Sequence, residues 1–127
     1  MTVFLEHVNV TVRDPKATAA TLVKLFDWEI RWEGAGMTTG SSVHVGAGNS
    51  YIALFSYGDP APAIEGDSHN RMAALNHIGV VVDDLEAIEA KVVSLGFEPH
   101  SHADYEPGQR FYFQDGDGVE FEVVSYD

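Results

Sequence analysis

Two of the six histidines, His7 and His77, stand 70 residues apart in matching surroundings. An imidazole can bind a divalent metal ion, and it can give or take a proton near neutral pH. Each histidine begins a run in which aliphatic residues occupy every second position, which is the period of a β-strand. The aliphatic face of each strand is expected to pack on a helix, which leaves the two histidines on the opposite face.

The composition excludes several other kinds of chemistry. The chain has no cysteine, so disulfide scaffolds, thiolate metal sites and cysteine nucleophiles are ruled out. Twenty acidic against seven basic residues give a net charge of -13, the wrong sign for binding nucleic acid or an anionic membrane surface. The N-terminus lacks the pattern of a signal peptide, and no hydrophobic run approaches the roughly 20 residues of a membrane span. We therefore expect a cytoplasmic protein.

A duplication organises the chain. When the sequence is shifted by 70 residues, 7–25 aligns with 77–95 without a gap, and eight of the 19 pairs are identical. Chance would supply about one or two identities, so the pattern indicates a repeated module. The identical pairs are His7/His77, Val10/Val80, Val12/Val82, Asp14/Asp84, Ala17/Ala87, Ala20/Ala90, Val23/Val93 and Leu25/Leu95.

Each copy predicts a strand, a helix and three further strands. Asp14-Pro15 begins the first helix, Asp83 or Asp84 begins the second, and Gly96 ends it. The later strands are expected at 28–33, 42–45 and 51–56 in the first copy and at 97–102, 110–114 and 119–125 in the second, with a hairpin turn at 115–118. The prediction is one α+β domain, 1–127, made of two βαβββ modules, 1–57 and 72–127, joined by a linker, 58–71.

The two modules, a histidine on the first strand of each, and the closing Phe-Tyr-Phe-x-Asp-x-Asp-Gly-x-x-x-Glu of 111–122 together resemble the vicinal oxygen chelate superfamily. That superfamily includes glyoxalase I, extradiol dioxygenases, fosfomycin-resistance enzymes, methylmalonyl-CoA epimerase and metal-free bleomycin-binding proteins. The resemblance covers nearly the whole chain. It implies that the modules pair into a curved, cup-shaped mixed sheet with helices on the outer face.

The resemblance also implies where metal ligands lie, on the first and last strands of each module. Those positions are His7, Ala53, His77 and Glu122, and alanine cannot bind a metal. Two imidazoles and one carboxylate can hold a divalent ion on one face and leave positions open for substrate, water or oxygen. Fe(II) and Mn(II) suit this set best, and Zn(II) or Ni(II) also fit. Glu120 lies on the same strand face as Glu122 and is the alternative carboxylate.

Ala53 narrows the implied reaction. Glyoxalase I resembles this chain but needs a carboxylate at that position, and the epimerase has a glutamine there. Fosfomycin resistance needs basic residues, whereas 99–110 offers only Arg110 as a fixed positive charge. The order of His102, Tyr112 and Glu122 is similar to that of extradiol dioxygenases. There, the tyrosine would donate a hydrogen bond to a metal-bound oxygen and the histidine, or alternatively His69, would act as acid or base.

Strand alternation adds candidates for substrate binding, namely Trp32, His44, Tyr51, Phe55 and Arg110. They would line an aromatic pocket with one cation. The leading hypothesis is a metal-dependent enzyme on a small oxygen-chelating substrate, with ring-cleaving dioxygenation favoured over lyase or isomerase chemistry. The alternative is a metal-free protein that sequesters an antibiotic or aromatic metabolite. The resemblance implies a homodimer, with each site built within one chain or across two.

Overall fold

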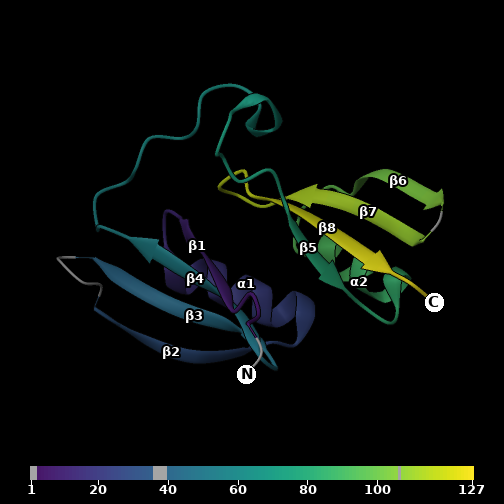
Figure 1. The fold of residues 1–127 in the computed structure, drawn as a ribbon, viewed down its shortest axis with the longest axis horizontal. Coiled ribbons are helices and arrows are strands. Elements are labelled where there is room, and N and C mark those ends of the chain that lie inside the picture. Colours follow the sequence, from purple (N-terminus) through teal and green to yellow (C-terminus); the bar gives the residue numbers. More distant parts are fainter. Residues whose placement is uncertain (1–2, 36–39, 106) are drawn as a thin grey trace. The chain divides into compact units, whose positions relative to one another are not determined.

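The chain repeats one arrangement of helix and strands in two compact units, Met1–Pro62 and Ala63–Asp127. The computed structural model describes 3–35, 40–105 and 107–127. Figure 1 shows that each unit contains one long helix and four strands, in the order strand, helix, strand, strand, strand. We call them the N-terminal unit and the C-terminal unit.

The N-terminal unit is a four-stranded mixed sheet with one helix. Its strand order is β1-β4-β3-β2, in which β1 runs parallel to β4 and the other neighbours are antiparallel. The elements are β1 (His7–Thr11), α1 (Pro15–Phe26), β2 (Glu29–Ala35), β3 (Ser41–Ala47) and β4 (Ser50–Ser56).

The C-terminal unit has the same topology, with strand order β5-β8-β7-β6 and β5 parallel to β8. Its elements are the 3-10 helix η1 (Ser68–Asn70), β5 (Ile78–Val81), α2 (Leu85–Ser94), β6 (His100–Tyr105), β7 (Gly108–Gln114) and β8 (Glu120–Ser125). The predicted α+β fold of two βαβββ modules is therefore confirmed, and both sheets are open. The single domain and the pairing of the two modules into one cup stay predictions.

Local signals fix where the helices begin and end. The Asp14 carboxylate accepts hydrogen bonds from the Lys16 and Ala17 backbone N–H groups, and Pro15 occupies the first helical position. In the second copy it is Asp84 that caps α2, through the N–H of Ala87. These carboxylates satisfy donors that the first helical turn would otherwise leave unpaired.

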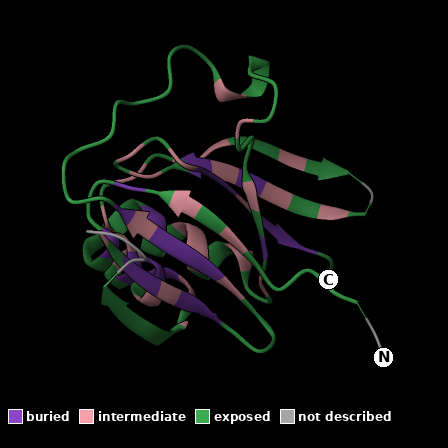
Figure 2. Cartoon of the chain, turned by 60° about the vertical axis from the view of Figure 1, so that its left-hand side comes forward, coloured by how far each residue is buried: buried purple, intermediate pink, exposed green. Residues whose placement is uncertain are grey.

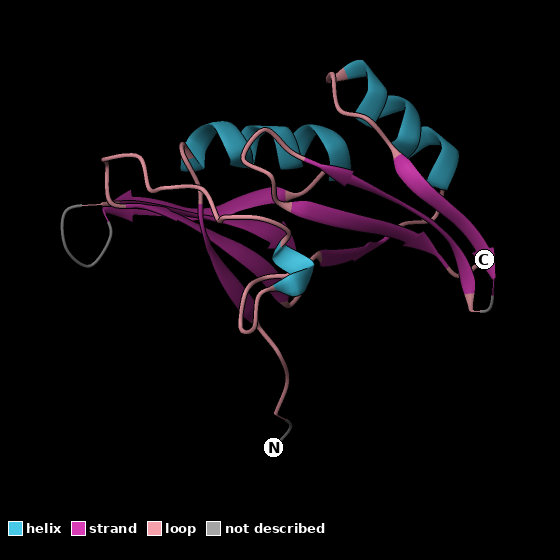
Figure 3. Cartoon of the chain, turned by 90° about the horizontal axis from the view of Figure 1, so that it is seen from above, coloured by secondary structure: helices cyan, strands magenta, loops and turns pink. Residues whose placement is uncertain are grey.

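Each sheet has a buried face and a polar face. In the N-terminal unit, Leu22 and Leu25 of α1 are buried, as are Val43 and Val45 of the neighbouring strand β3. Figure 3 shows α1 lying along one face of its sheet, and Figure 2 shows the burial concentrated in β3 and β4. The apolar residues of the C-terminal unit follow the same rule, with Phe111, Phe113, Phe121, Val123 and Val92 of α2 all buried. Because strand side chains alternate, the residues between them point to the face without a helix.

Two boundaries differ from expectation. Strand β6 begins at His100 instead of residue 97, because the N–H of Phe97 donates to the Val92 carbonyl and so completes the end of α2. The expected linker contains η1, which Asp67 caps by accepting from the His69 N–H. Neither helix in the described part of the chain is long and apolar enough to cross a membrane.

Candidate functional site

The sheet registers relate the two units residue by residue. In the N-terminal unit Asn9 pairs with Ala53, and in the C-terminal unit Gly79 pairs with Glu122. Since Asn9 and Gly79 are 70 residues apart, Ala53 and Glu122 occupy equivalent places on the closing strands. The C-terminal unit therefore carries a carboxylate where the N-terminal unit carries a methyl group.

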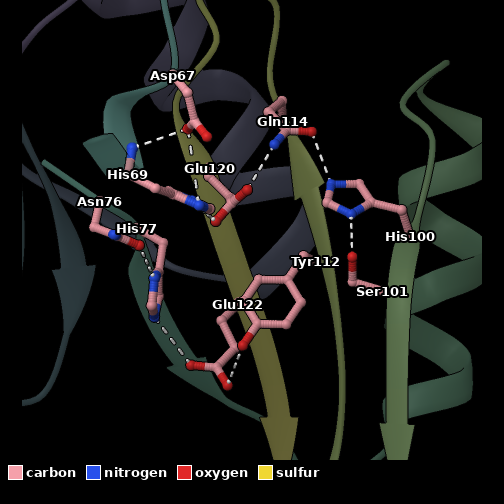
Figure 4. Close-up of polar contacts among 10 residues, drawn as sticks. All are labelled: Asp67, His69, Asn76, His77, His100, Ser101, Tyr112, Gln114, Glu120 and Glu122. Atoms are coloured by element: carbon pink, nitrogen blue, oxygen red, sulfur yellow. Dashed lines mark hydrogen bonds and ion pairs between the residues drawn. The ribbon is translucent and has the colours of Figure 1, made fainter. Parts of the chain in front are cut away.

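In the C-terminal unit, His77 and Glu122 point toward each other across β5 and β8 (Figure 4). His77 Nε2 lies 3.3 Å from Glu122 Oε1, and the side chains are 35% and 14% exposed. The other ring nitrogen, Nδ1, lies 2.7 Å from the Asn76 side-chain oxygen and donates its hydrogen to it. A neutral His77 then presents a lone pair at Nε2, so two acceptors face each other. A cation placed between them would remove that repulsion.

The donor chemistry of this pair fits a divalent metal ion. Imidazole nitrogen and carboxylate oxygen both bind first-row metals, at about 2.0–2.2 Å. Two such ligands at right angles would place their donor atoms about 3 Å apart, close to the 3.3 Å found between Nε2 and Oε1. His77 and Glu122 can therefore serve as two neighbouring ligands.

The second oxygen of Glu122 is held by neighbours on β7. Arg110 Nη1 donates to Oε2 at 2.8 Å, and the Tyr112 hydroxyl donates to the same oxygen at 3.2 Å. Burial and the Glu122 charge raise the pKa of Tyr112, so the phenol keeps its proton and remains a donor. The hydrogen bond to Glu122 raises the pKa of Arg110. Both contacts orient the carboxylate and leave Oε1 directed at His77.

His7 of the N-terminal unit is prepared in the same way as His77. Its Nδ1 lies 2.9 Å from Glu6 Oε1, so the residue just before the histidine again accepts the Nδ1 hydrogen. This tautomer leaves Nε2 as the ligating nitrogen. The Tyr51 hydroxyl donates to the same oxygen at 3.3 Å, and the rings of His7 and Tyr51 stack 4.8 Å apart.

Two of the three predicted metal ligands meet within one unit. His77 and Glu122 belong to the C-terminal unit, whereas His7 belongs to the N-terminal unit. Within 3–35, 40–105 and 107–127, no three His, Asp or Glu side chains lie close enough together to hold a metal ion. The complete set of three ligands therefore stays a prediction.

Four of the predicted pocket residues lie in the N-terminal unit, and three of them continue a row of rings that starts at His7. Tyr51 and His44 stack 4.7 Å apart, and His44 and Trp32 lie 5.0 Å apart, so the row crosses all four strands. The Arg31 guanidinium lies 5.0 Å from the centre of the Tyr51 ring. Burial, reinforced by the charges of His7 and Arg31, lowers the pKa of His44 and favours its neutral form.

The other pocket candidate of this unit, Phe55, stands apart from that row. Its ring meets the edge of Tyr57 at 4.7 Å, further along β4. Arg110, the remaining pocket candidate, lies instead in the C-terminal unit, beside Glu122.

The structure does not bring His102 to Tyr112. His102 Nε2 lies 2.9 Å from Glu89 of α2, and its ring stacks on buried Phe111, so it occupies the helix-covered face. The pairing of β6 with β7 shifts between His100 and Ala103, and Ser101 has a positive φ of 56°. This irregularity turns His102 away from the face that simple alternation assigns to it.

The sequence analysis missed a second polar chain on the same face as Glu122. Glu120, whose side chain is only 8% exposed, lies 2.8 Å from His69 Nε2 and accepts from Gln114 at 2.7 Å. Gln114 in turn lies 2.8 Å from His100, which had been placed in solvent (Figure 4). The alternation of 110, 112 and 114 with 120 and 122 was the signal that could have found it.

Comparisons with known proteins agree with this geometry. A family model described as the Glyoxalase/Bleomycin resistance protein/Dioxygenase superfamily matches residues 4–123. No curated protein sequence matches the chain.

Solved structures show the same fold at low sequence identity. A glyoxylase/bleomycin resistance protein/dioxygenase domain from Frankia sp. EAN1pec has a TM-score of 0.82 and 21% identity, covering 100% of both chains. The fosfomycin resistance protein FosX from Mesorhizobium loti has a TM-score of 0.73 and 22% identity, covering 98% of this chain and 92% of its own. FosX from Listeria monocytogenes, complexed with Mn(II) and sulfate, has a TM-score of 0.75 and 19% identity, covering 98% and 93%.

Proposed function

The chain belongs to the glyoxalase/bleomycin resistance protein/dioxygenase superfamily, and we propose that it is a divalent-metal-dependent enzyme acting on a small organic substrate that chelates through oxygen. The observation that carries the proposal is the pair of acceptors, His77 Nε2 and Glu122 Oε1, that face each other at 3.3 Å. A carboxylate and an imidazole so oriented are suited to share a cation.

His77, Glu122 and His7 would hold the metal, with His7 coming from the same chain or from a second copy in a homodimer. Fe(II) or Mn(II) is the preferred ion, and Zn(II) or Ni(II) is also compatible with these donors. The structure of Listeria FosX contains Mn(II), which supports a divalent ion in this fold. When bound, such an ion acts as a Lewis acid on substrate oxygens, and iron can also activate dioxygen.

Within this class we favour ring-cleaving dioxygenation over lyase or isomerase chemistry. Ala53, which is 2% exposed, can neither take a proton nor bind a metal, so the N-terminal unit lacks the base that proton-transfer reactions in this superfamily use. Tyr112 keeps its proton and lies on the same face as Glu122, where its hydroxyl can donate to a substrate oxygen. Trp32, His44, Tyr51 and Phe55 would contact the aromatic part of the substrate.

His69 replaces His102 as the candidate acid or base. It shares a hydrogen bond with Glu120, two residues before Glu122 on β8, whereas His102 bonds to α2. A carboxylate behind an imidazole fixes its tautomer and supports proton transfer at the other nitrogen.

One observation favours a second candidate function, the metal-free sequestration of an aromatic compound. The row from His7 through Tyr51 and His44 to Trp32 places four rings on one sheet face. Such a surface can bind a planar molecule without any metal. This function would need neither His77 nor Glu122.

Metal content separates the two candidates. The protein would be purified anaerobically without chelators or an affinity tag, beside His77→Ala, and analysed for iron, manganese, zinc and nickel. Near-stoichiometric metal that is lost in the variant supports the enzyme, and catechols are then screened for oxygen uptake. Metal-free protein that none of the four ions stabilises against unfolding contradicts it and favours sequestration.

A further inference from the structure

Arg110 has hydrogen-bonding capacity that the structure leaves unused. Its side chain is 11% exposed, and only Nη1 is engaged, at 2.8 Å from Glu122 Oε2. In the described part of the chain, Nε and Nη2 are shielded from solvent and have no hydrogen-bond partner. Buried donors are nearly always satisfied, and a charged group left unpaired is especially unfavourable.

The unused donors lie on one edge of the guanidinium. The Tyr105 ring lies 4.8 Å from Cζ and covers the flat face of the group, which attracts the cation but accepts no N–H bond from the edge. Nε and Nη2 project side by side, and this is the edge with which arginine grips the two oxygens of a carboxylate. The geometry therefore calls for a planar anion with two oxygens.

The charges around Glu122 call for the same ligand. Strands β5 to β8 contain one basic residue other than histidine, Arg110. Two neutral imidazoles, the Glu122 carboxylate and this guanidinium sum to zero, so a divalent ion gives the site a charge of 2+. A substrate with one ionised chelating oxygen and one carboxylate would neutralise it.

We propose that Arg110 selects substrates that carry a carboxylate next to their chelating oxygens, with the carboxylate accepting hydrogen bonds from Nε and Nη2. This inference rests on the proposed function, because the metal would hold the chelating oxygens. It adds the substrate class: a hydroxylated aromatic or aliphatic carboxylate, in contrast to an uncharged diol. Tyr105, whose side chain is largely exposed, would move aside as the carboxylate enters.

The test compares catechol with 2,3-dihydroxybenzoate, which differs by the carboxylate alone. Zinc-loaded protein is used because Zn(II) is diamagnetic, and binding is followed by calorimetry and by the arginine Nε–H signals in nitrogen-15 NMR spectra. The chain has four arginines, and the signal missing from Arg110→Lys identifies Arg110. Lys91→Met, a charge loss at an exposed position of α2, is the matched control.

We expect 2,3-dihydroxybenzoate to bind at least about tenfold more tightly than catechol, since a hydrogen-bonded charge pair supplies that factor or more. It should shift the Arg110 Nε–H signal, which catechol leaves in place. The preference should disappear in Arg110→Lys, because an ammonium group cannot grip two oxygens in this way, and it should persist in Lys91→Met. Equal affinities in the wild type, or a preference retained by Arg110→Lys, would overturn the inference and show that buried water satisfies these donors.

Failure of the proposed function has a different signature. Catechol would then bind equally well with and without zinc. In that event the zinc-free protein decides the inference on its own, since benzoate must still shift the Arg110 Nε–H signal for the carboxylate site to stand. An unshifted signal at saturating benzoate overturns it.

Discussion

The two units share a backbone plan and differ in what they place on the polar face. Each begins with a histidine whose Nδ1 hydrogen is accepted by the preceding residue, Glu6 for His7 and Asn76 for His77. Only the C-terminal unit adds a carboxylate on the closing strand, because its Glu122 corresponds to Ala53. The duplication therefore preserved the preparation of the imidazole while one position decided which unit gains a second ligand.

The residues opposite that position follow the same division. His44 pairs with Ala53 on the neighbouring strand, whereas Tyr112 pairs with Glu122. His44 continues a row of rings, and Tyr112 donates a hydrogen bond to the carboxylate. The comparison teaches that the N-terminal unit offers an aromatic surface and one ligand, and the C-terminal unit offers charge and donors.

Removing the carboxylate should erase the difference and have the largest effect. Glu122→Gln is expected to weaken Zn(II) or Mn(II) binding by more than about 100-fold, which is the upper range for losing an outer-shell partner. Calorimetry measures the affinity. Glu89→Gln, which breaks the His102 contact on the opposite sheet face, is the control and should bind metal normally. Equal affinity in Glu122→Gln and wild type would disprove Glu122 as a ligand.

Adding a carboxylate to the N-terminal unit should narrow the difference from the other side. Ala53→Glu introduces a charge at a buried position, so the free energy of unfolding should fall by about 1–3 kcal/mol in the absence of metal. Divalent ions should recover part of that loss, since ligands of the native state stabilise it. Thermal unfolding with and without Mn(II) measures both effects. A variant whose stability does not respond to metal would show that this position cannot reach the ion.

The Tyr112 hydroxyl should contribute less than the ligand it orients. Tyr112→Phe removes one of the two donors to Glu122 Oε2, so metal affinity should fall by about tenfold, the lower range for an outer-shell partner. Calorimetry is again the measurement, and Tyr126→Phe at an exposed position is the control. Unchanged affinity in Tyr112→Phe would leave the orientation of Glu122 to Arg110 alone.

The smallest expected effect concerns His44 in the aromatic row. Because burial lowers its pKa below the ordinary value of 6.5, the unfolded chain binds a proton more readily than the folded chain. Stability should therefore decline as the pH falls through 6.5 toward the lowered folded value. His44→Phe should flatten this decline in urea unfolding curves recorded between about pH 7.5 and 5. Parallel declines in variant and wild type would mean that His44 is not responsible.

Much of the fold could be predicted from the sequence because its signals are local. Asp14-Pro15 and Asp84 satisfy the first turn of each helix from within a few residues, and the alternation around His7 and His77 specifies strands with two faces. The 70-residue repeat extends these signals to the whole chain. The equivalence of Ala53 and Glu122 follows from the same repeat, and the sheet registers agree with it.

The placement of individual side chains was harder to predict. Alternation puts His102 beside Tyr112, but the irregular backbone at Ser101 turns it to the α2 face. A bulge depends on how two strands pair, and the sequence of one strand does not reveal it. His69, in the segment expected to be a linker, instead bonds to Glu120, 51 residues away.

The sequence by itself determined the two βαβββ modules, the helix ends, the histidines at the start of each module and the single carboxylate that distinguishes them. These features depend on residue type and short spacing, which act before any long-range contact forms. Only the tertiary structure decided that Arg110 and Tyr112 hold one oxygen of Glu122 while His77 faces the other. Such contacts join residues from three strands, and their directions depend on register, bulges and burial that no local pattern encodes.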